Sequence, residues 1–164
     1  MKAVNTMKNK TLLITPSRCI GCLNCELACS SRDWSEYFPA PSKIKLIFFK
    51  DGGQVPVACF QCDAAPCLAV CRTGALKRNE PSGVVDVDPD RCIGCRACVM
   101  ACPFGNVVYS QAGRRAVKCD QCGGSPRCAA ACPSRAIEFV PDEDAVRERR
   151  RSFAAGLKAA LKEI

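Results

Sequence analysis

Short apolar runs alternate with turn residues along the first 140 positions of the chain. Runs of β-branched and aromatic residues bounded by Gly, Asp or Pro are typical of strands. They predict short strands at 11–15, 43–49, 54–58, 75–77, 84–87, 107–109, 115–117 and 136–140. Ala- and Leu-rich pieces, two of which start at Pro, predict short helices at 25–29, 66–71, 96–102 and 126–132. Small strands interspersed with short helices predict an α+β fold.

Two segments carry apolar residues outside this alternation. In residues 142–164 the apolar positions lie close to one helical face: Val146, Phe153, Leu157, Leu161 and Ile164. We expect a C-terminal amphipathic helix there, which either packs back onto its own domain or docks onto a partner. Three aromatic residues in the link after residue 30 are expected in the core, with an interface as the alternative: Trp34, Tyr37 and Phe38.

Sixteen cysteines fall into four groups of four with none left over. Group one is Cys19, Cys22, Cys25 and Cys29, and group two is Cys59, Cys62, Cys67 and Cys71. Group three is Cys92, Cys95, Cys98 and Cys102, and group four is Cys119, Cys122, Cys128 and Cys132. Groups one and three have the spacing C-x2-C-x2-C-x3-C, whereas groups two and four widen the middle gap. The chain therefore contains an internal fourfold repeat.

This spacing has a chemical reason. Three closely spaced cysteines can wrap a loop around an iron–sulfur cube, and the fourth points away from it. In two-cluster ferredoxins that fourth cysteine ligates the other cluster. Pro103 and Pro133 follow it in groups three and four and end the short helical turn. The sequence predicts four [4Fe–4S] clusters with these cysteines as ligands of the iron.

Other uses of cysteine fit less well. Structural zinc favours two separated C-x2-C pairs, and a disulfide scaffold favours a secretory signal. The third cysteine packed into each group fits the zinc pattern poorly, and no secretory signal is present. The C-x3-C-x2-C spacing of radical-SAM sites does not occur. The chain has no histidine, which removes His-ligated metal centres and Ser-His-Asp or Cys-His catalysis.

The clusters change the meaning of the formal charge of +8. Each oxidised cluster with four thiolates carries about −2, so four bring the holoprotein close to neutral. The basic residues then serve as charge compensation, and without interleaved aromatics they do not predict a nucleic-acid site. Lys118, Arg91 and Arg18 directly precede cluster cysteines. They either favour the reduced state of a cluster or are ordinary solvated charges.

The chain offers no targeting or membrane signal. Residues 1–10 lack an apolar run behind their lysines, and no 18-residue apolar stretch occurs. We expect a cytoplasmic protein with no membrane span, and export together with a signal-bearing partner stays open.

Four stretches resemble one known family: CIGCLNCELAC, CFQCDAAPCLAVCRTGAL, CIGCRACVMACPFG and KCDQCGGSPRCAAACPSRAI. They are similar to the four-cluster ferredoxin-type subunits of dimethyl-sulfoxide reductase, nitrate reductase, formate hydrogenlyase, carbon monoxide dehydrogenase and tungsten aldehyde oxidoreductase systems. The resemblance covers about residues 11–140. It implies a polyferredoxin domain at 11–141, built from tandem, nested bacterial-ferredoxin-like units, followed by the helix at 142–164.

The resemblance also implies how the ligands pair. Group one would pair with group four in an outer unit, and group two with group three in an inner unit at 55–110. The four implied sites are Cys19, Cys22, Cys25 and Cys132 (cluster 1), Cys119, Cys122, Cys128 and Cys29 (cluster 2), Cys59, Cys62, Cys67 and Cys102 (cluster 3), and Cys92, Cys95, Cys98 and Cys71 (cluster 4). The segment between Cys102 and Cys119 would also suit a connection inside a two-cluster unit, so spacing alone leaves the pairing open.

The expected function is electron transfer without catalysis. A cube with four cysteine ligands has no open coordination position, and the chain lacks GxGxxG and P-loop motifs. The resemblance implies a larger catalytic partner with a tungsten or molybdenum pterin, an aldehyde oxidoreductase first among them. A formate dehydrogenase, a hydrogenase or carbon monoxide dehydrogenase is the alternative. A flavin subunit, a ferredoxin or a head-to-tail copy of this chain would stand at the other end. A free-standing polyferredoxin carrier is the second hypothesis, and a redox-sensing regulator fits less well.

Overall fold

The computed structural model describes residues 10–33, 41–80 and 82–160. Trp34, Tyr37, Phe38, Leu161 and Ile164 lie outside the described residues. The strands are β1 (Lys10–Ile14), β2 (Lys45–Phe48), β3 (Gln54–Val57), β4 (Leu76–Arg78), β5 (Val85–Val87), β6 (Val107–Ser110), β7 (Arg115–Lys118) and β8 (Ile137–Pro141). The helices are α1 (Asn24–Ser30), α2 (Pro66–Ala69), α3 (Ala97–Ala101), α4 (Arg127–Ala130) and α5 (Asp142–Ala160). Three 3-10 turns are η1 (Pro16–Arg18), η2 (Ser31–Asp33) and η3 (Gln121–Gly124).

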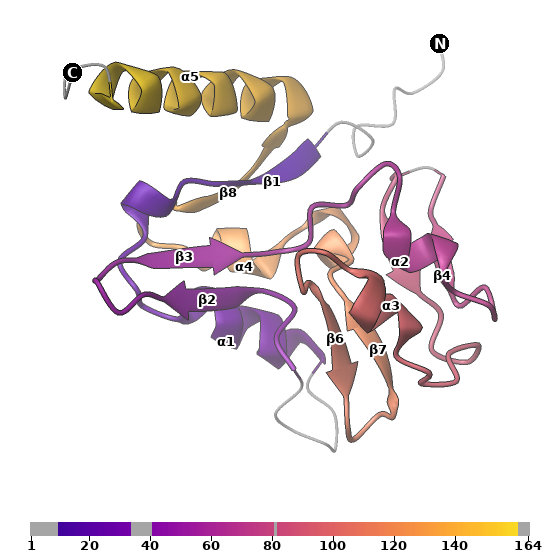
Figure 1. Cartoon of the computed structure of the whole chain (residues 1–164). Helices are drawn as coiled ribbons and strands as arrows, with labels where there is room; N and C mark the ends of the chain where they lie inside the picture. The colour runs from indigo at the N-terminus through magenta and orange to yellow at the C-terminus, as the bar shows by residue number, and fades with distance from the viewer. Residues whose placement is uncertain (1–9, 34–40, 81, 161–164) are drawn as a thin grey trace, which may run out of the picture.

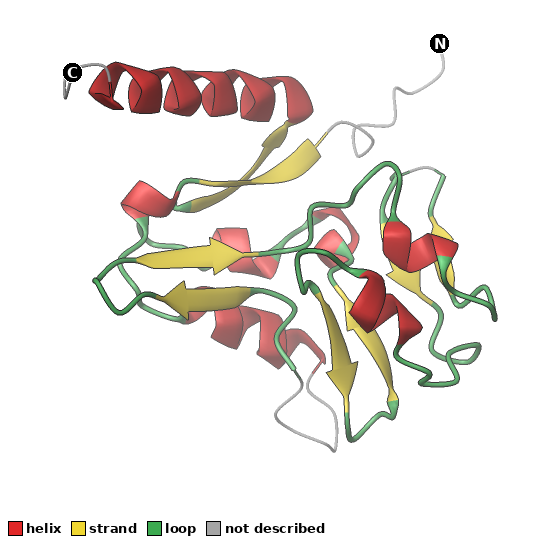
Figure 2. Cartoon of the chain, in the orientation of Figure 1, coloured by secondary structure: helices red, strands yellow, loops and turns green. Residues whose placement is uncertain are grey.

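This mixture of small strands and short helices confirms the predicted α+β class (Figure 2). Every strand and short helix overlaps the segment expected for it, and no end differs by more than two residues. The agreement follows from the turn residues, because glycine and proline mark the ends of these short elements.

The strands form four separate two-stranded antiparallel sheets. Three are hairpins between consecutive strands: β2–β3, β4–β5 and β6–β7. The fourth joins the first and last of the described strands, since β1 pairs with β8 from Lys10 opposite Pro141 to Ile14 opposite Ile137. Figure 1 shows β1 and β8 side by side beneath α5, with the β2–β3 hairpin below them.

The buried residues form two cores. We call the first the outer core, and it contains Leu12, Cys25, Ile44, Ala58, Cys128 and Ile137. The second is the inner core, which contains Ala65, Cys67, Leu76, Val85, Cys98, Val107 and Ala116. Helices α1 and α4 pack together in the first region, and α2 and α3 in the second. Each core is small and includes two buried cysteines, and further cysteines pack against it. Both cores are therefore built around cysteine side chains.

The inner core also includes a residue of β7, beyond the third cysteine group. Ala116 of β7 is 5% exposed and belongs to this core. This placement has a simple cause, because β7 pairs with β6 and also contacts β5. The hairpin that leads into group four therefore packs with groups two and three.

Helix α5 follows β8 without a connecting loop and packs against β1 and β8. Ala145 is 1% exposed, which lets the helix approach the strands closely. Val146 is 44% exposed, although it belongs to the apolar face expected to pack. No helix in the described part of the chain is both long and apolar enough to cross a bilayer.

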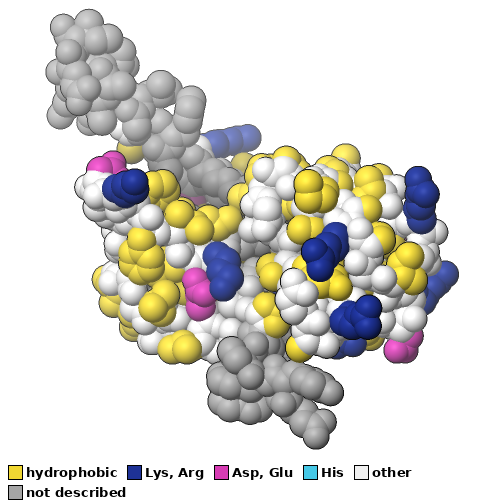
Figure 3. Space-filling view, turned by 60° about the horizontal axis from the view of Figure 1, so that its bottom comes forward, with side chains coloured by type: hydrophobic (Ala, Val, Ile, Leu, Met, Phe, Trp, Pro, Cys, Tyr) yellow, Lys and Arg dark blue, Asp and Glu magenta, His cyan; other side chains and the backbone are white. Residues whose placement is uncertain are grey.

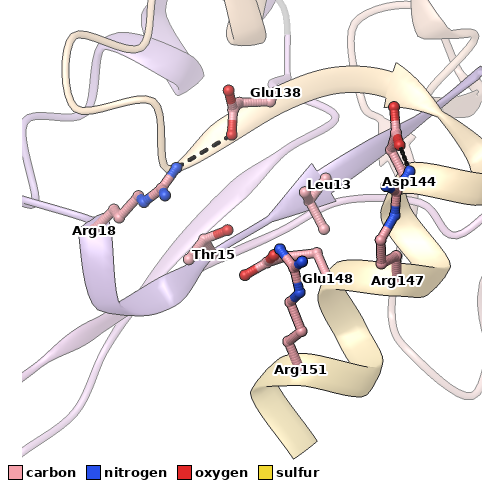
Figure 4. A pocket seen from close by; sticks show the side chains of 8 residues that line it. All are labelled: Leu13, Thr15, Arg18, Glu138, Asp144, Arg147, Glu148 and Arg151. Carbon is pink, nitrogen blue, oxygen red and sulfur yellow. Dashed lines mark hydrogen bonds and ion pairs between the residues drawn. The ribbon is translucent and has the colours of Figure 1, made fainter.

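A polar pocket lies where α5 meets the two strands (Figure 4). Three arginines and three carboxylates line it: Arg18, Arg147, Arg151, Glu138, Asp144 and Glu148. Arg18 donates to Glu138 at 3.3 Å, and Arg147 pairs with Asp144. The charges of the two signs balance, so this pocket is a set of surface ion pairs, which are weakly stabilising.

We expect Ile137→Ala to destabilise the outer core. Ile137 is 2% exposed and lies opposite Ile14 at the end of the β1–β8 ladder. Removing a buried Ile side chain to Ala costs about 2–5 kcal/mol, and urea unfolding of the anaerobically loaded protein measures this loss. The matched control is Ile47→Ala on β2, where Ile47 is 44% exposed and we expect a loss below about 1 kcal/mol. Equal losses in the two variants would contradict the placement of Ile137.

Candidate iron–sulfur sites

All sixteen cysteines lie in the described part of the chain, and none of them forms a disulfide there. The outer core or its immediate surroundings contain cysteines of groups one and four: Cys25, Cys29, Cys119, Cys128 and Cys132. The inner core or its surroundings contain cysteines of groups two and three: Cys67, Cys71, Cys92, Cys98 and Cys102. Cysteines far apart in sequence therefore meet, because β1 pairs with β8 and α1 packs on α4.

Four thiols line one cavity in the outer core: Cys29, Cys119, Cys122 and Cys128. Three of them come from group four, and Cys29 comes from the end of group one. Leu12, Ile44 and Ala58 supply an apolar wall. A water-poor hollow lined by soft sulfur ligands suits an iron–sulfur cluster.

A second cavity, in the inner core, is also lined by four thiols. Its thiols are Cys59, Cys62, Cys67 and Cys102. Here three cysteines come from group two and the last from group three. Phe60 and Phe104 also line this cavity, and their rings meet edge to face at 4.8 Å. Both cavities thus combine three cysteines of one group with the fourth cysteine of another.

Some of the cysteines that line neither cavity also lie close to one another. Burial raises the pKa of the Cys98 thiol, and its neighbours Cys92, Cys71 and Cys95 raise it further by repulsion between thiolates. These four come from group three and the end of group two. In the remaining set, burial raises the pKa of Cys25 to about 11, with a smaller contribution from Cys19. Cys132 lies beside the same core, and Cys22 is exposed.

Each cysteine loop turns through a left-handed residue just before its second cysteine. The φ angles are +73° at Gly21, +52° at Gln61, +70° at Gly94 and +53° at Gln121. Glycine adopts this conformation freely, but glutamine does so only at a cost of order 1–3 kcal/mol. The loops of groups two and four thus carry strain that the surrounding structure must hold in place.

The Gln61 side chain was not singled out by its sequence position, yet it forms a hub between the loops of two cysteine groups. Its Nε2 donates to the backbone carbonyl of Cys119 at 2.6 Å. Its Oε1 accepts from the Val85 backbone N–H at 3.0 Å and from Lys118 Nζ at 2.8 Å. In sequence, only the replacement of glycine by glutamine in the C-x2-C loop indicates a special position.

The fourth cysteine of three groups receives a hydrogen bond from the backbone. Donors are Lys43 N–H to Cys29 Sγ at 3.2 Å, Leu76 N–H to Cys71 Sγ at 3.4 Å, and Asn106 N–H to Cys102 Sγ at 3.3 Å. At Cys71 burial raises the pKa, but N–H donors and the Thr73 hydroxyl outweigh it and hold the pKa below its usual value. Donors of this kind stabilise a thiolate and tune a bound cluster.

Charged side chains border the outer cavity. Arg32 donates to Asp120, and both side chains line the cavity that contains Cys119 and Cys122. Burial raises the pKa of Asp120, but the Arg32 hydrogen bond and the Lys43 charge outweigh it and lower the pKa. The carboxylate therefore stays ionised and joins η2 to the loop of group four.

The three cations that directly precede cysteines differ in burial. Lys118 is 4% exposed and lines the inner cavity. The Arg18 side chain is 53% exposed and pairs with Glu138, and Arg91 is exposed. These three residues have equivalent positions in the sequence, but only Lys118 is buried.

Comparison with known proteins agrees with this geometry. The family described as 4Fe-4S dicluster domain matches residues 51–142, and the family described as 4Fe-4S binding domain matches residues 16–32. The polyferredoxin-like subunit of an aliphatic sulfonate oxidoreductase from Pyrococcus furiosus is 43% identical over 122 residues, which cover 74% of this chain and 70% of that protein.

Two relatives come from Escherichia coli. A subunit of anaerobic dimethyl sulfoxide reductase is 36% identical over 164 aligned positions, which cover 87% of this chain and 78% of that subunit. Protein NrfC is 38% identical over 138 residues, which cover 75% of this chain and 61% of NrfC. The [4Fe–4S] domains and the named subunits agree with the cofactor predicted from cysteine spacing. The chain belongs to the family of [4Fe–4S] ferredoxin-type electron-transfer subunits of oxidoreductase complexes.

Proposed function

We propose that this chain carries four [4Fe–4S] clusters and relays single electrons between a larger catalytic subunit and a second redox partner. The observation that carries the proposal is the pair of cavities that each join three thiols of one cysteine group to the fourth thiol of another. When bound, each cluster supplies a one-electron redox centre with no open position for a substrate. The protein's part is to hold, insulate and tune these centres.

The two cavities support the nested assignment of ligands. One cluster is held by Cys119, Cys122, Cys128 and Cys29, and another by Cys59, Cys62, Cys67 and Cys102. By the same logic the outermost sites use Cys19, Cys22, Cys25 and Cys132 at one end, and Cys92, Cys95, Cys98 and Cys71 at the other. The backbone hydrogen bonds to the fourth cysteines favour their thiolate form and so prepare them as ligands.

The two cavity sites are neighbours, which supports a continuous row of clusters. Burial raises the pKa of Cys119 to about 12, and Cys59 of the other cavity raises it as well. Gln61, from the loop of group two, donates to the carbonyl of Cys119. Electrons therefore have a path from the outer to the inner unit through packed protein rather than through water.

Both ends of the row reach the surface. Cys22 and Cys95 are exposed, and each lies near an exposed isoleucine, Ile20 at 63% and Ile93 at 71%. Apolar side chains recur over the face seen in Figure 3, with separate Lys and Arg side chains among them. An apolar rim beside an exposed ligand suits close docking of a redox partner.

The catalytic partner we propose is an oxidoreductase with a tungsten or molybdenum pterin. Support comes from relatives that are named as subunits of an aliphatic sulfonate oxidoreductase and a dimethyl sulfoxide reductase. An aldehyde oxidoreductase remains within this proposal. A flavin subunit or a soluble ferredoxin would take or deliver electrons at the other end.

One observation favours a free-standing polyferredoxin carrier as the second candidate. Helix α5, a natural docking element, already packs against β1 and β8 of its own chain. In the carrier case both ends of the row would meet partners transiently.

Purification of the untagged protein from its native host under anaerobic conditions separates these two functions. We expect about 16 irons and 16 sulfides per chain, since each of four cubes contributes four of each. A stoichiometric larger chain that brings tungsten or molybdenum supports the subunit function, whereas iron alone in a lone chain supports the carrier. Zinc in place of iron would end both proposals.

The nested pairing predicts which cysteine variants share a spectrum. Cys67→Ser and Cys102→Ser alter the same site, because both thiols line one cavity. We expect the two variants to change the same signal in electron paramagnetic resonance of the reduced protein. Cys98→Ser is the matched control, since it comes from the same group as Cys102 and should change a different signal. If Cys102→Ser matched Cys98→Ser instead, each group would hold its own cluster and the nesting would be wrong.

Cluster loading should release protons and improve with rising pH. Burial raises the pKa of Cys119 and of Cys128 to about 12 and of Cys25 to about 11. These thiols are protonated at neutral pH and must lose their protons to bind iron. Iron uptake by anaerobic reconstitution should be faster at about pH 9 than at about pH 7, since thiolate is more abundant nearer these pKa values. Equal uptake rates at the two pH values, without proton release, would contradict the raised pKa values.

A further inference from the structure

Lys118 is a buried cation on the last position of β7. It is 4% exposed, and alternation along the strand turns it to the same side as the buried Ala116. Its Nζ donates to the backbone carbonyl of Val85 and to Oε1 of Gln61, each at 2.8 Å. These two acceptors fix the ammonium on the side of the inner core.

Within the described residues, no carboxylate pairs with Lys118. Its two hydrogen-bond partners are neutral, and a buried charge without an opposite charge is costly. Lys118 does line the cavity formed by Cys59, Cys62, Cys67 and Cys102. A [4Fe–4S] cluster with four thiolates in that cavity carries about −2 when oxidised and one charge more when reduced. A bound cluster would therefore supply the opposite charge that Lys118 does not receive from a carboxylate.

Lys118 directly precedes Cys119, but its side chain does not line the cavity of that cysteine's own group. It reaches instead to the cavity of group two, where Gln61 from the C-x2-C loop receives it. Gln61 in turn donates to the carbonyl of Cys119 at 2.6 Å. The two residues thus lock the junction between the outer and inner units and hold the ammonium there.

Arg18 and Arg91 provide the internal comparison. Each directly precedes the first cysteine of its group, as Lys118 does. Arg18 is neutralised by Glu138, and Arg91 is exposed to solvent. Water and salt screen such charges, whereas a buried charge keeps its effect at short range.

We propose, on the basis of the function proposed above, that Lys118 is the counter-cation of the cluster held by Cys59, Cys62, Cys67 and Cys102 and that it raises the reduction potential of this cluster. A fixed positive charge favours the more negative, reduced state. The middle of the row then holds an electron more strongly than its cysteine ligands alone would allow. Gln61 is the positioning residue that keeps the ammonium in place.

The test is a redox titration of the anaerobically purified holoprotein with dithionite, followed by electron paramagnetic resonance. In Lys118→Met we expect one cluster to become harder to reduce by about tenfold, which is about 59 mV for a one-electron couple. Arg91→Met is the matched control and should shift every cluster by less. Lys118→Arg keeps the charge and should keep the wild-type potentials. Unchanged potentials in Lys118→Met, or an equal shift in Arg91→Met, would overturn the proposal.

Iron content decides the case in which a variant binds fewer clusters. Lys118→Gln is a second neutral variant, and its amide can still donate to the Val85 carbonyl. Iron loss in both neutral variants, with full loading of Lys118→Arg, supports the counter-cation because the charge is then needed to hold the cluster. Iron loss in all three variants would overturn it in favour of a packing role. Four reducible clusters in the wild-type protein keep the proposed electron transfer intact in either case.

Discussion

Most of the cysteines are buried or half-buried, yet each loaded site brings negative charge into the protein, and this conflict governs the structure. The pKa of Cys25, Cys119 and Cys128 rises to about 11 or 12 because burial disfavours their thiolates. Backbone N–H groups of short loops donate hydrogen bonds to several of the sulfur atoms, which favours the thiolate. The chain adds cations near the cavities, of which Lys118 is the most buried. The remaining basic residues bring the loaded protein close to neutrality.

The same conflict explains the unusual backbone. Four loops each need a left-handed residue before the second cysteine, and two of these residues are glutamines rather than glycines. A glutamine at this position costs conformational free energy, but its amide adds polar contacts that glycine cannot. Gln61 uses them to connect three backbone or side-chain groups from β5, β7 and the loop of group four. The strained Gln61 thereby connects the loop of group two to β5 and to the end of β7.

Much of the fold was predictable from the sequence because its signals are local. Glycine and proline mark the short strands and helices, and cysteine spacing indicates the cofactor. Partners distant in sequence were harder to predict. Neither the pairing of β1 with β8 nor the placement of Ala116 in the inner core follows from local pattern. The hub at Gln61 was not anticipated, and Lys118 looked like Arg18 and Arg91 because burial depends on tertiary packing.

The pairing of β1 with β8 also bears on how the protein is made. The inner core draws on residues from Ala65 to Ala116, so the ribosome delivers all of it before it reaches Ile137 of the outer core. The outer core contains both Leu12 and Ile137, so it can form only after both have been synthesised. The cysteines of group one can therefore meet those of group four only late in synthesis. Closing so long a loop is slow and comes late. The inner core can therefore close on the nascent chain before the outer core, which closes only once β8 has been synthesised.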